Sequence, residues 1–146
     1  MTLDAALKMS NENRIEEWVH QYLLQAHPTG NKGLSDGLKL IKRYWTGPIK
    51  IDFAKLIQGC GPSSDFIFHE DENIWNIRIK SNISMLEQNM LPPPIIVEYK
   101  DNKLHIADGN HRFASMRDFG IKEYWGIIWF NSEEDYREYL NIVNSK

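Results

Sequence analysis

The chain has 146 residues, a formal net charge of −3, 42% hydrophobic residues and 25% charged residues. This length predicts a single domain over residues 1–146, and the composition is typical of a globular protein. The acidic balance excludes a global positive field that would attract nucleic acid. Cys60 is the only cysteine, which excludes an intrachain disulfide and a cysteine-based zinc site.

The sequence predicts neither a secretory signal nor a membrane-spanning helix. Its opening residues, MTLDAALKMS, lack the charged start and the long apolar core of a signal peptide. Its apolar runs are all much shorter than the ~20 residues that a spanning helix needs. We therefore expect a cytoplasmic protein that does not contact a membrane.

The first third of the chain predicts helices. We expect a loose lead-in over residues 1–10, and then a helix capped by Ser10 or Asn11 that extends to Ala26. Ser35 is a suitable cap for a second helix. The apolar face of this second helix would hold Leu38, Ile41 and Trp45. Residues 1–47 would thus form a helical extension of a core that occupies residues 48–146.

The remaining residues alternate between strand and helix patterns. In chain order we predict a strand at 49–53, a loop at 58–65, a short strand at 66–68, a helix at 74–90, a hairpin of strands at 95–99 and 104–107, a helix at 110–119, a strand at 123–130 and a last helix capped by Ser132. Interspersed helices and strands with one hairpin favour an α+β fold with a small mixed sheet.

The stretch HIADGNHRFAS, residues 105–115, places five polar or flexible residues where a strand becomes a helix. The free N–H groups of a helix start suit an anion, and Gly109 lets a ligand approach the backbone. Arg112 opposes the helix dipole, which would be explained by a bidentate contact with an anion, and His111 could donate to phosphate or move a proton. The alternative is a plain helix cap, with Asp108 or Asn110 as the capping residue. Spacing alone does not decide between them.

The segment LPPPIIVEYKDNKLHIADGNHRFASMRDFGIKEYWGIIWF resembles the core of the ParB/sulfiredoxin superfamily, and the resemblance covers about residues 66–130. It implies a small mixed sheet with an N-terminal helical extension and a C-terminal helix. In this superfamily the turn binds nucleotide phosphates. The resemblance therefore implies that Asp108, Gly109, Asn110, His111 and Arg112 contact a nucleotide.

Two branches of the superfamily fit less well than a third. Asn110 stands where sulfiredoxin has its catalytic cysteine, and asparagine cannot act as a redox nucleophile. The chromosome-partitioning branch has a different turn sequence and continues into a helix-turn-helix, whereas the residues after Gly120 predict one strand and one helix. We therefore do not favour a DNA-reading role, although association with DNA remains an alternative.

The free serine kinase is locally the most similar branch, because FHEDEN supplies a His-Glu pair, His69 and Glu70, and the turn follows its DGxHR pattern. This similarity implies Glu70 as a catalytic base, His111 and Arg112 as phosphate-holding residues, and Asp108 as a Mg²⁺ partner. Asn110 departs from the second histidine of the kinase, which puts serine as the acceptor in doubt. The alternative for the His-Glu pair is a solvated acidic turn.

The sequence thus predicts a nucleotide-binding protein that acts as a phosphotransferase or a nucleotide hydrolase. Its expected catalytic residues are Glu70 and His111, and its expected cofactors are ATP or ADP, with CTP as a further option, and Mg²⁺. A small hydroxyl compound would be the acceptor, and a homodimer could form through an exposed edge strand. We predict no protein-bound metal centre. The alternative function is a non-catalytic nucleotide- or DNA-associated module.

Overall fold

The computed structural model describes residues 2–25, 30–63, 65–66 and 68–144. In chain order these residues form α1 (Leu3–Asn11), α2 (Ile15–Leu23), α3 (Lys32–Leu38), β1 (Tyr44–Asp52), the 3₁₀ turn η1 (Phe53–Lys55), β2 (Leu56–Ile57), β3 (Cys60–Gly61), β4 (Phe68–His69), α4 (Glu72–Glu87), β5 (Ile95–Lys100), β6 (Lys103–Asp108), α5 (Asn110–Asp118), β7 (Glu123–Phe130) and α6 (Glu133–Asn144). Within the described ranges, no helix is long and apolar enough to cross a membrane.

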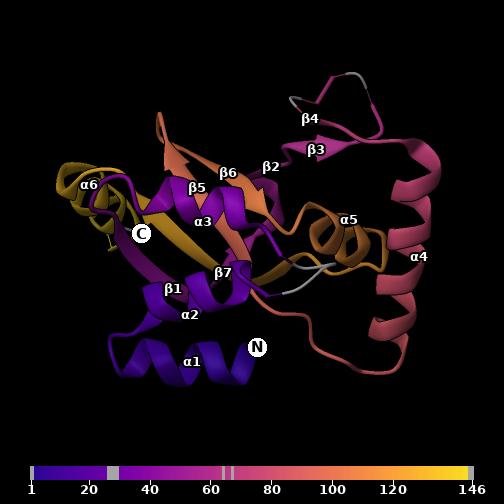
Figure 1. Cartoon of the computed structure of the whole chain (residues 1–146), viewed down its shortest axis with the longest axis horizontal. Coiled ribbons are helices and arrows are strands. Elements are labelled where there is room, and N and C mark those ends of the chain that lie inside the picture. The colour runs from indigo at the N-terminus through magenta and orange to yellow at the C-terminus, as the bar shows by residue number, and fades with distance from the viewer. Residues whose placement is uncertain (1, 26–29, 64, 67, 145–146) are drawn as a thin grey trace.

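The main sheet has five strands in the order β1-β7-β5-β6-β2 (Figure 1). The β1–β7 and β5–β6 pairs are antiparallel, whereas β5–β7 and β2–β6 are parallel. The sheet is therefore mixed, which confirms the predicted α+β class. The β5–β6 hairpin turns at Asp101 and Asn102, whose φ angles of 54° and 63° suit a tight two-residue turn.

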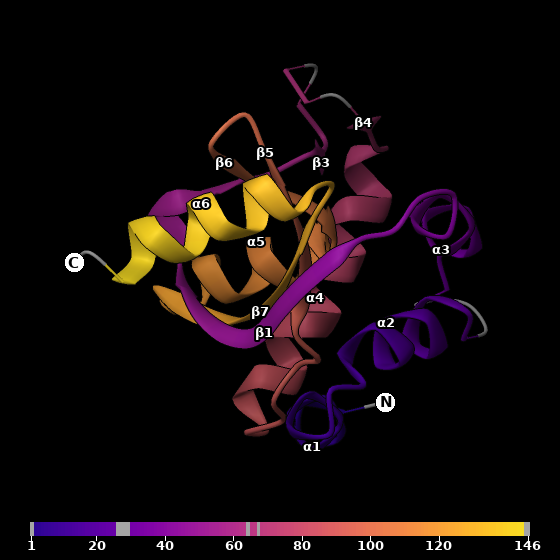
Figure 2. The same ribbon diagram turned by 90° about the vertical axis from the view of Figure 1, so that its left-hand side faces the viewer.

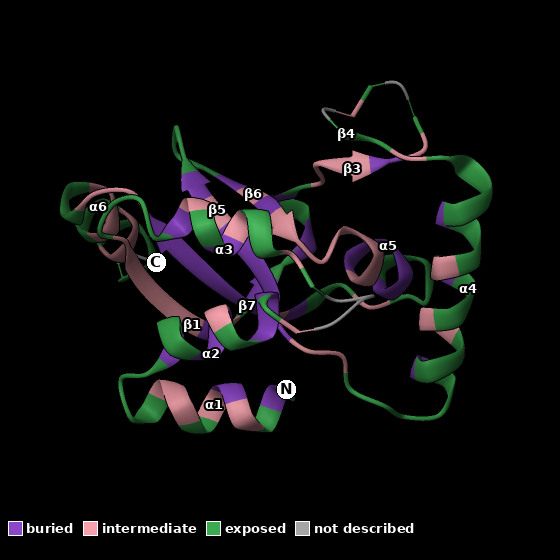
Figure 3. Cartoon of the chain, in the orientation of Figure 1, coloured by how far each residue is buried: buried purple, intermediate pink, exposed green. Residues whose placement is uncertain are grey.

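Helices cover both faces of this sheet, as Figures 1 and 2 show from two directions. On one face, α2 and α3 pack on β5 and β7 through Trp18, Tyr22, Leu38, Ile96 and Ile127. The strands inside the sheet are buried almost throughout their length, whereas α4 and α6 keep exposed outer faces (Figure 3). Burial of apolar surface on both faces is the main stabilising contribution.

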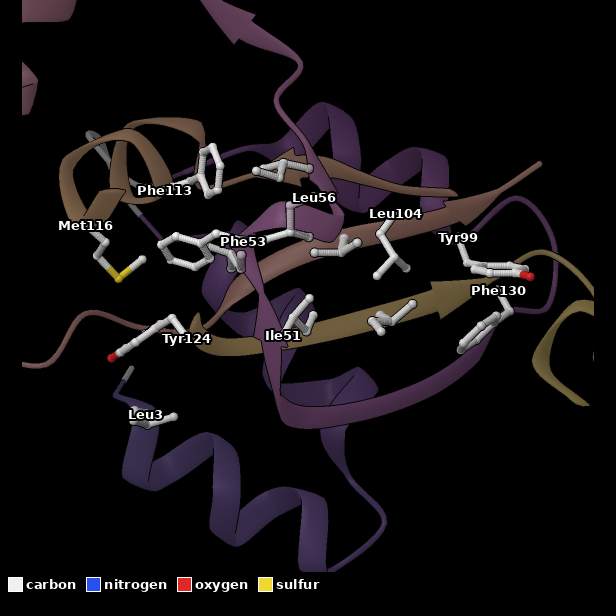
Figure 4. Close-up of a cluster of buried hydrophobic side chains, with 14 of the residues drawn as sticks. Leu3, Ile51, Phe53, Leu56, Tyr99, Leu104, Phe113, Met116, Tyr124 and Phe130 are labelled. Atoms are coloured by element: carbon white, nitrogen blue, oxygen red, sulfur yellow. The ribbon is translucent and has the colours of Figure 1, made fainter. Parts of the chain in front are cut away.

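The other face of the sheet carries the larger core cluster, drawn in Figure 4. Phe113 and Met116 of α5 pack there beside Phe53, whose ring centroid lies 4.9 Å from that of Phe113. Tyr99 and Phe130 pack together at the opposite end, with ring centroids 5.3 Å apart and ring planes tilted by 46°. This packing fixes α5 against the sheet and so holds the start of α5 at the end of β6.

A separate small cluster attaches α4 to the outside of α5. Trp75 and Ile79 of α4 pack on Ala114 of α5, with Cys60 and Ile83 at the margin of the cluster. Asp71 caps α4 by accepting from the N–H groups of Asn73 at 3.0 Å and Ile74 at 3.1 Å. The predicted helix at 74–90 therefore begins slightly earlier, at Glu72.

The structure differs from the sequence prediction in the N-terminal part. Residues 3–11 form α1, capped by Thr2, instead of a loose lead-in. The next helix begins at Ile15 after Arg14, so neither Ser10 nor Asn11 caps it. The predicted end of this helix at Ala26 lies outside the described residues.

The second predicted helix is also shorter and placed earlier. It is α3, capped by Asn31 and ending at Leu38, so Ser35 lies inside it. Ile41 is 53% exposed in the following loop, and Trp45 pairs with Trp129 in the sheet. The strand predicted at 49–53 therefore begins earlier, at Tyr44, because long-range pairing with β7 outweighs the local helical spacing.

Candidate functional site

The turn between β6 and α5 centres on Gly109, which has a φ of +105° and occupies the N-cap position of α5. A Cβ added there would lie 2.7 Å from Nη2 of Arg112 and 2.9 Å from Cγ2 of Ile95, so the position requires glycine. The first turn of α5 closes with Phe113 N–H donating to the Gly109 carbonyl at 2.8 Å. The N–H groups of Asn110, His111 and Arg112 precede this bond and have no partner within the helix. The turn thus has the backbone geometry predicted for anion binding.

Glu70 and His111 meet at this turn, although they are far apart in the sequence. His111 Nε2 lies 2.8 Å from Glu70 Oε2, and the two side chains are 21% and 17% exposed. The parallel β3–β4 pair places Glu70, whose N–H donates to the Gly61 carbonyl at 2.9 Å. The Trp75 ring lies against the imidazole, with centroids 4.7 Å apart. His69, by contrast, is exposed on β4.

Two further side chains contact the Glu70 carboxylate. Cys60 Sγ lies 3.7 Å from Oε2, and Arg78 Nη1 lies 3.9 Å from Oε1. Burial, reinforced by the charge of Glu70, raises the pKa of the Cys60 thiol, so the thiol remains protonated and donates to Glu70. Oε1 is buried and has no hydrogen-bond partner among the described residues.

Burial lowers the pKa of His111 below its usual value of 6.5, although the neighbouring Glu70 charge acts in the opposite direction. The imidazole is therefore neutral at pH 7. In its neutral form the ring has one N–H, and the contact with Glu70 places that N–H on Nε2. The lone pair then resides on Nδ1, where it can accept a proton.

Arg112 contacts protein groups on several sides. Its Nη1 donates to the Tyr22 hydroxyl at 2.5 Å, its Nη2 donates to the Pro94 carbonyl at 2.9 Å, and Asp108 Oδ2 lies 3.6 Å from Nη2. The side chain is 14% exposed, and its Nε is buried without a partner among the described residues. Arg112 therefore ties the turn to α2 and to the segment before β5. Its predicted contact with an anion stays a prediction.

The remaining turn residues also make specific contacts. Asn110 Oδ1 accepts from Gly59 N–H at 2.8 Å, which attaches the loop before β3 to the start of α5. Asp108 Oδ1 accepts from Asn31 Nδ2 at 3.5 Å. Neither Asp108 nor Asn110 caps α5 through its side chain, so the plain helix-cap alternative is wrong.

A cavity of about 1110 Å³ surrounds the start of α5. The turn residues 108–112 form its middle, and α3, the end of β6 and α4 form its walls. Its α4 wall is lined by Arg78, Ser81, Asn82, Met85 and Leu86. This volume is large enough for a small-molecule cofactor. The structure thus brings all the sequence-predicted site residues except the exposed His69 to one cavity or its border.

Sequence reasoning missed Tyr22, Cys60, Trp75 and Arg78 as site residues. Tyr22 comes from α2, Cys60 from β3, and Trp75 and Arg78 from α4, and each reaches the turn only through tertiary packing. Cys60 lies in the Gly-rich loop predicted at 58–65. In the part of the chain that the structure describes, no group of three or more His, Cys, Asp or Glu side chains could hold a metal ion.

Comparison with protein-family models gives no match, and neither does comparison with curated protein sequences. Among solved structures, sulfiredoxin from Arabidopsis thaliana is similar with a TM-score of 0.44 and 20% identity, over 63% of this chain and 94% of that chain. A Pnob8-like ParB-N domain is similar with a TM-score of 0.42 and 18% identity, over 66% of this chain and 33% of that chain. The pNOB8-like ParB N-domain is similar with a TM-score of 0.40 and 14% identity, over 67% of this chain and 32% of that chain.

These likenesses assign neither a family nor an activity to this chain. The alignment spans about a third of each ParB chain. What the chain binds and which reaction it performs must therefore be argued from its own site.

Proposed function

We propose that this protein binds a nucleotide with its phosphates at the start of α5 and transfers or hydrolyses the terminal phosphoryl group. The observation that carries the proposal is the half-buried Glu70–His111 pair, with 2.8 Å between Oε2 and Nε2, beside the free N–H groups of a glycine-capped helix. Helix starts of this kind bind phosphate through backbone N–H groups and the helix dipole. The resemblance of residues 66–130 to a phosphate-binding superfamily supports the same assignment.

His111 is the better placed of the two expected catalytic residues to act as the base. The Glu70 carboxylate already accepts from His111 and Cys60, whereas the neutral imidazole retains a lone pair on Nδ1. Glu70 would orient the ring and stabilise the imidazolium after proton transfer, as a carboxylate does beside a catalytic histidine. We assign Glu70 this orienting role instead of the role of the base itself.

The proposed reaction moves the terminal phosphoryl group to a hydroxyl or to water. An acceptor hydroxyl, or water in a hydrolase, gives its proton to His111 as its oxygen forms a bond to the terminal phosphorus. The bond between that phosphorus and the bridging oxygen breaks, and the nucleoside diphosphate leaves. The helix N–H groups stabilise the charge on the transferring phosphoryl oxygens.

Mg²⁺ fits this site as an ion carried by the nucleotide. Mg²⁺ in nucleotide sites is commonly held by substrate phosphates and one or two carboxylates, and Asp108 is the carboxylate beside the turn. Bound Mg²⁺ would neutralise phosphate charge. Arg112 would hold the turn in shape through Tyr22 and Pro94.

The proposal is tested by calorimetric titration with ATP, ADP and CTP in the presence of Mg²⁺, followed by measurement of phosphate release or transfer. Glu70→Gln should leave nucleotide affinity within about three-fold and lower turnover by about 10²-fold or more, because the amide no longer orients the His111 ring or stabilises its imidazolium. Glu72→Gln is the matched control, because Glu72 is exposed at the start of α4. Absence of binding of all three nucleotides to the native protein would refute the proposal, and binding without turnover would favour the non-catalytic module.

A further inference from the structure

The wall of the cavity formed by α4 is partly exposed and carries several polar side chains. Arg78, Ser81, Asn82 and Met85 follow one another at i, i+3, i+4 and i+7, so they form one stripe along α4, and all four line the cavity. The adjacent stripe, Trp75, Ile79 and Leu86, is buried. Packing on α5 therefore accounts for the apolar stripe, whereas the polar stripe faces the cavity and is partly exposed.

The polar groups of this stripe are available to a ligand. The side chain of Arg78 is 42% exposed, and its only ionic contact among the described residues is Glu70 at 3.9 Å, which is too long for a hydrogen bond. Within the same described ranges, the side chains of Ser81 and Asn82 have no hydrogen-bond partner. Asp108 and Arg112, in contrast, already contact other side chains.

Charge decides which chemical group this stripe would bind. A guanidinium with several free N–H donors matches an oxyanion in geometry and charge, and the Asn82 amide and Ser81 hydroxyl can donate to the same group. Glu70 lies beside Arg78 and would repel a second anion, but its Oε2 already accepts from His111 and Cys60. Glu70 approaches only Nη1 of Arg78. The other N–H groups of the guanidinium can therefore donate to an anion that binds on the α4 side of Arg78.

We infer that Arg78, Ser81 and Asn82 bind an oxyanion carried by the second substrate, and thereby place its hydroxyl beside His111. This inference rests on the proposed function, because it assigns the α5 start to the nucleotide and the α4 wall to the acceptor. Arg78 and His111 both contact Glu70, and both line the cavity, so one small molecule that carries an anion and a hydroxyl could contact both groups. The acceptor class is thus a small hydroxy acid or a small phosphorylated alcohol.

The two anion sources are separated by a matched set of three-carbon probes: glycerol, glycerate and glycerol 3-phosphate. Their affinities for ¹⁵N-labelled native protein are measured from the shifts of the α4 amide signals. We expect one of the two anions to bind at least about ten-fold more tightly than glycerol, which corresponds to one charge-assisted contact. The preferred anion identifies the source as carboxylate or phosphate.

Arg78→Gln should abolish the preference for the anion, and Arg78→Lys should restore part of it. Lys80→Gln removes the same charge from an exposed position that does not line the cavity, and it should leave the preference unchanged. Equal affinities of native protein for glycerol and both anions would overturn the inference. Persistence of the preference in Arg78→Gln would overturn it as well.

A parallel ATP titration of the same variants separates this inference from the proposed function. Loss of the anion preference with unchanged ATP affinity in Arg78→Gln supports separate sites for the two substrates. A ten-fold loss of ATP affinity in Arg78→Gln would place Arg78 in the nucleotide site and overturn the inference. If native protein fails to bind ATP but prefers the anion, the proposed function fails and the anion site on α4 stands.

Discussion

Arg112 offers a quantitative test of the structure, because its guanidinium joins three distant parts of the chain. Arg112→Ala removes hydrogen bonds to the Tyr22 hydroxyl and the Pro94 carbonyl. It also removes the cationic neighbour of Asp108, whose side chain is only 15% exposed in the native protein. Hydrogen bonds to charged groups contribute about 1.5–3 kcal/mol each, and loss of one partner of a fully buried ion pair costs about 3–5 kcal/mol. Because the pair is partly exposed and its separation is 3.6 Å, we expect about 3 kcal/mol.

Urea denaturation measures this loss directly as a change in the free energy of unfolding. For a chain of this size about 3 kcal/mol corresponds to a fall in Tm of roughly 6–12 °C. Arg117→Ala is the matched control on the same helix, because its side chain is 53% exposed and its loss should cost less than about 0.5 kcal/mol. A loss below about 1 kcal/mol for Arg112→Ala would refute the assigned contacts.

Three further predictions concern the same turn. Gly109→Ala should destabilise the fold by about 2 kcal/mol more than Gly120→Ala, since both have positive φ but only the Gly109 Cβ would clash; equal losses in thermal unfolding would contradict this. Asn110→Ala should cost about 1–2 kcal/mol in urea denaturation, because it orphans Gly59 N–H; a loss comparable to an exposed substitution would argue against that bond. His111 has a lower pKa in the native protein than in the unfolded chain, so the unfolded chain binds this proton more tightly. The free energy of unfolding should therefore fall as the pH drops below 6.5 towards the pKa of native His111. An NMR titration that shows protonation of native His111 above pH 6.5 would contradict this.

Much of the core of the fold could be predicted, because local patterns agree with the final structure there. The β5–β6 hairpin, α5, β7 and the Ser132-capped α6 have clear periodicity and turn residues, and Ser132 Oγ indeed accepts from Asp135 N–H at 3.1 Å. The turn itself was recognisable for the same reason. Its glycine, histidine and arginine are consecutive in the sequence, so no tertiary contact was needed to bring them together.

The prediction failed where distant contacts decide the local structure. Trp45 has helical spacing from Ile41, but pairing with Trp129 places it in β1. Residues 3–11 show a weak apolar pattern, and α1 is stabilised by burying Leu3 and Ala6 against the rest of the protein. Short helices depend on such packing because their intrinsic stability in water is marginal.

The same limitation applies to the site. The sequence suggested an anion partner for Arg112, whereas its partners in the structure are Tyr22, Pro94 and Asp108. The Cys60 and Arg78 contacts with Glu70 likewise depend on how β3 and α4 pack around α5. The sequence singled out the turn residues, but it did not predict which side chains would contact them.

The most direct measurement is a ¹H–¹⁵N NMR titration of the native protein with ATP and Mg²⁺. If phosphates bind at the start of α5, the amide signals of Asn110, His111 and Arg112 should show the largest downfield shifts, because their N–H groups would gain an anionic acceptor. Inorganic phosphate should shift the same signals with lower affinity. Shifts confined to other parts of the chain, or no shifts at millimolar ATP, would contradict the assignment of this turn as a nucleotide-phosphate site.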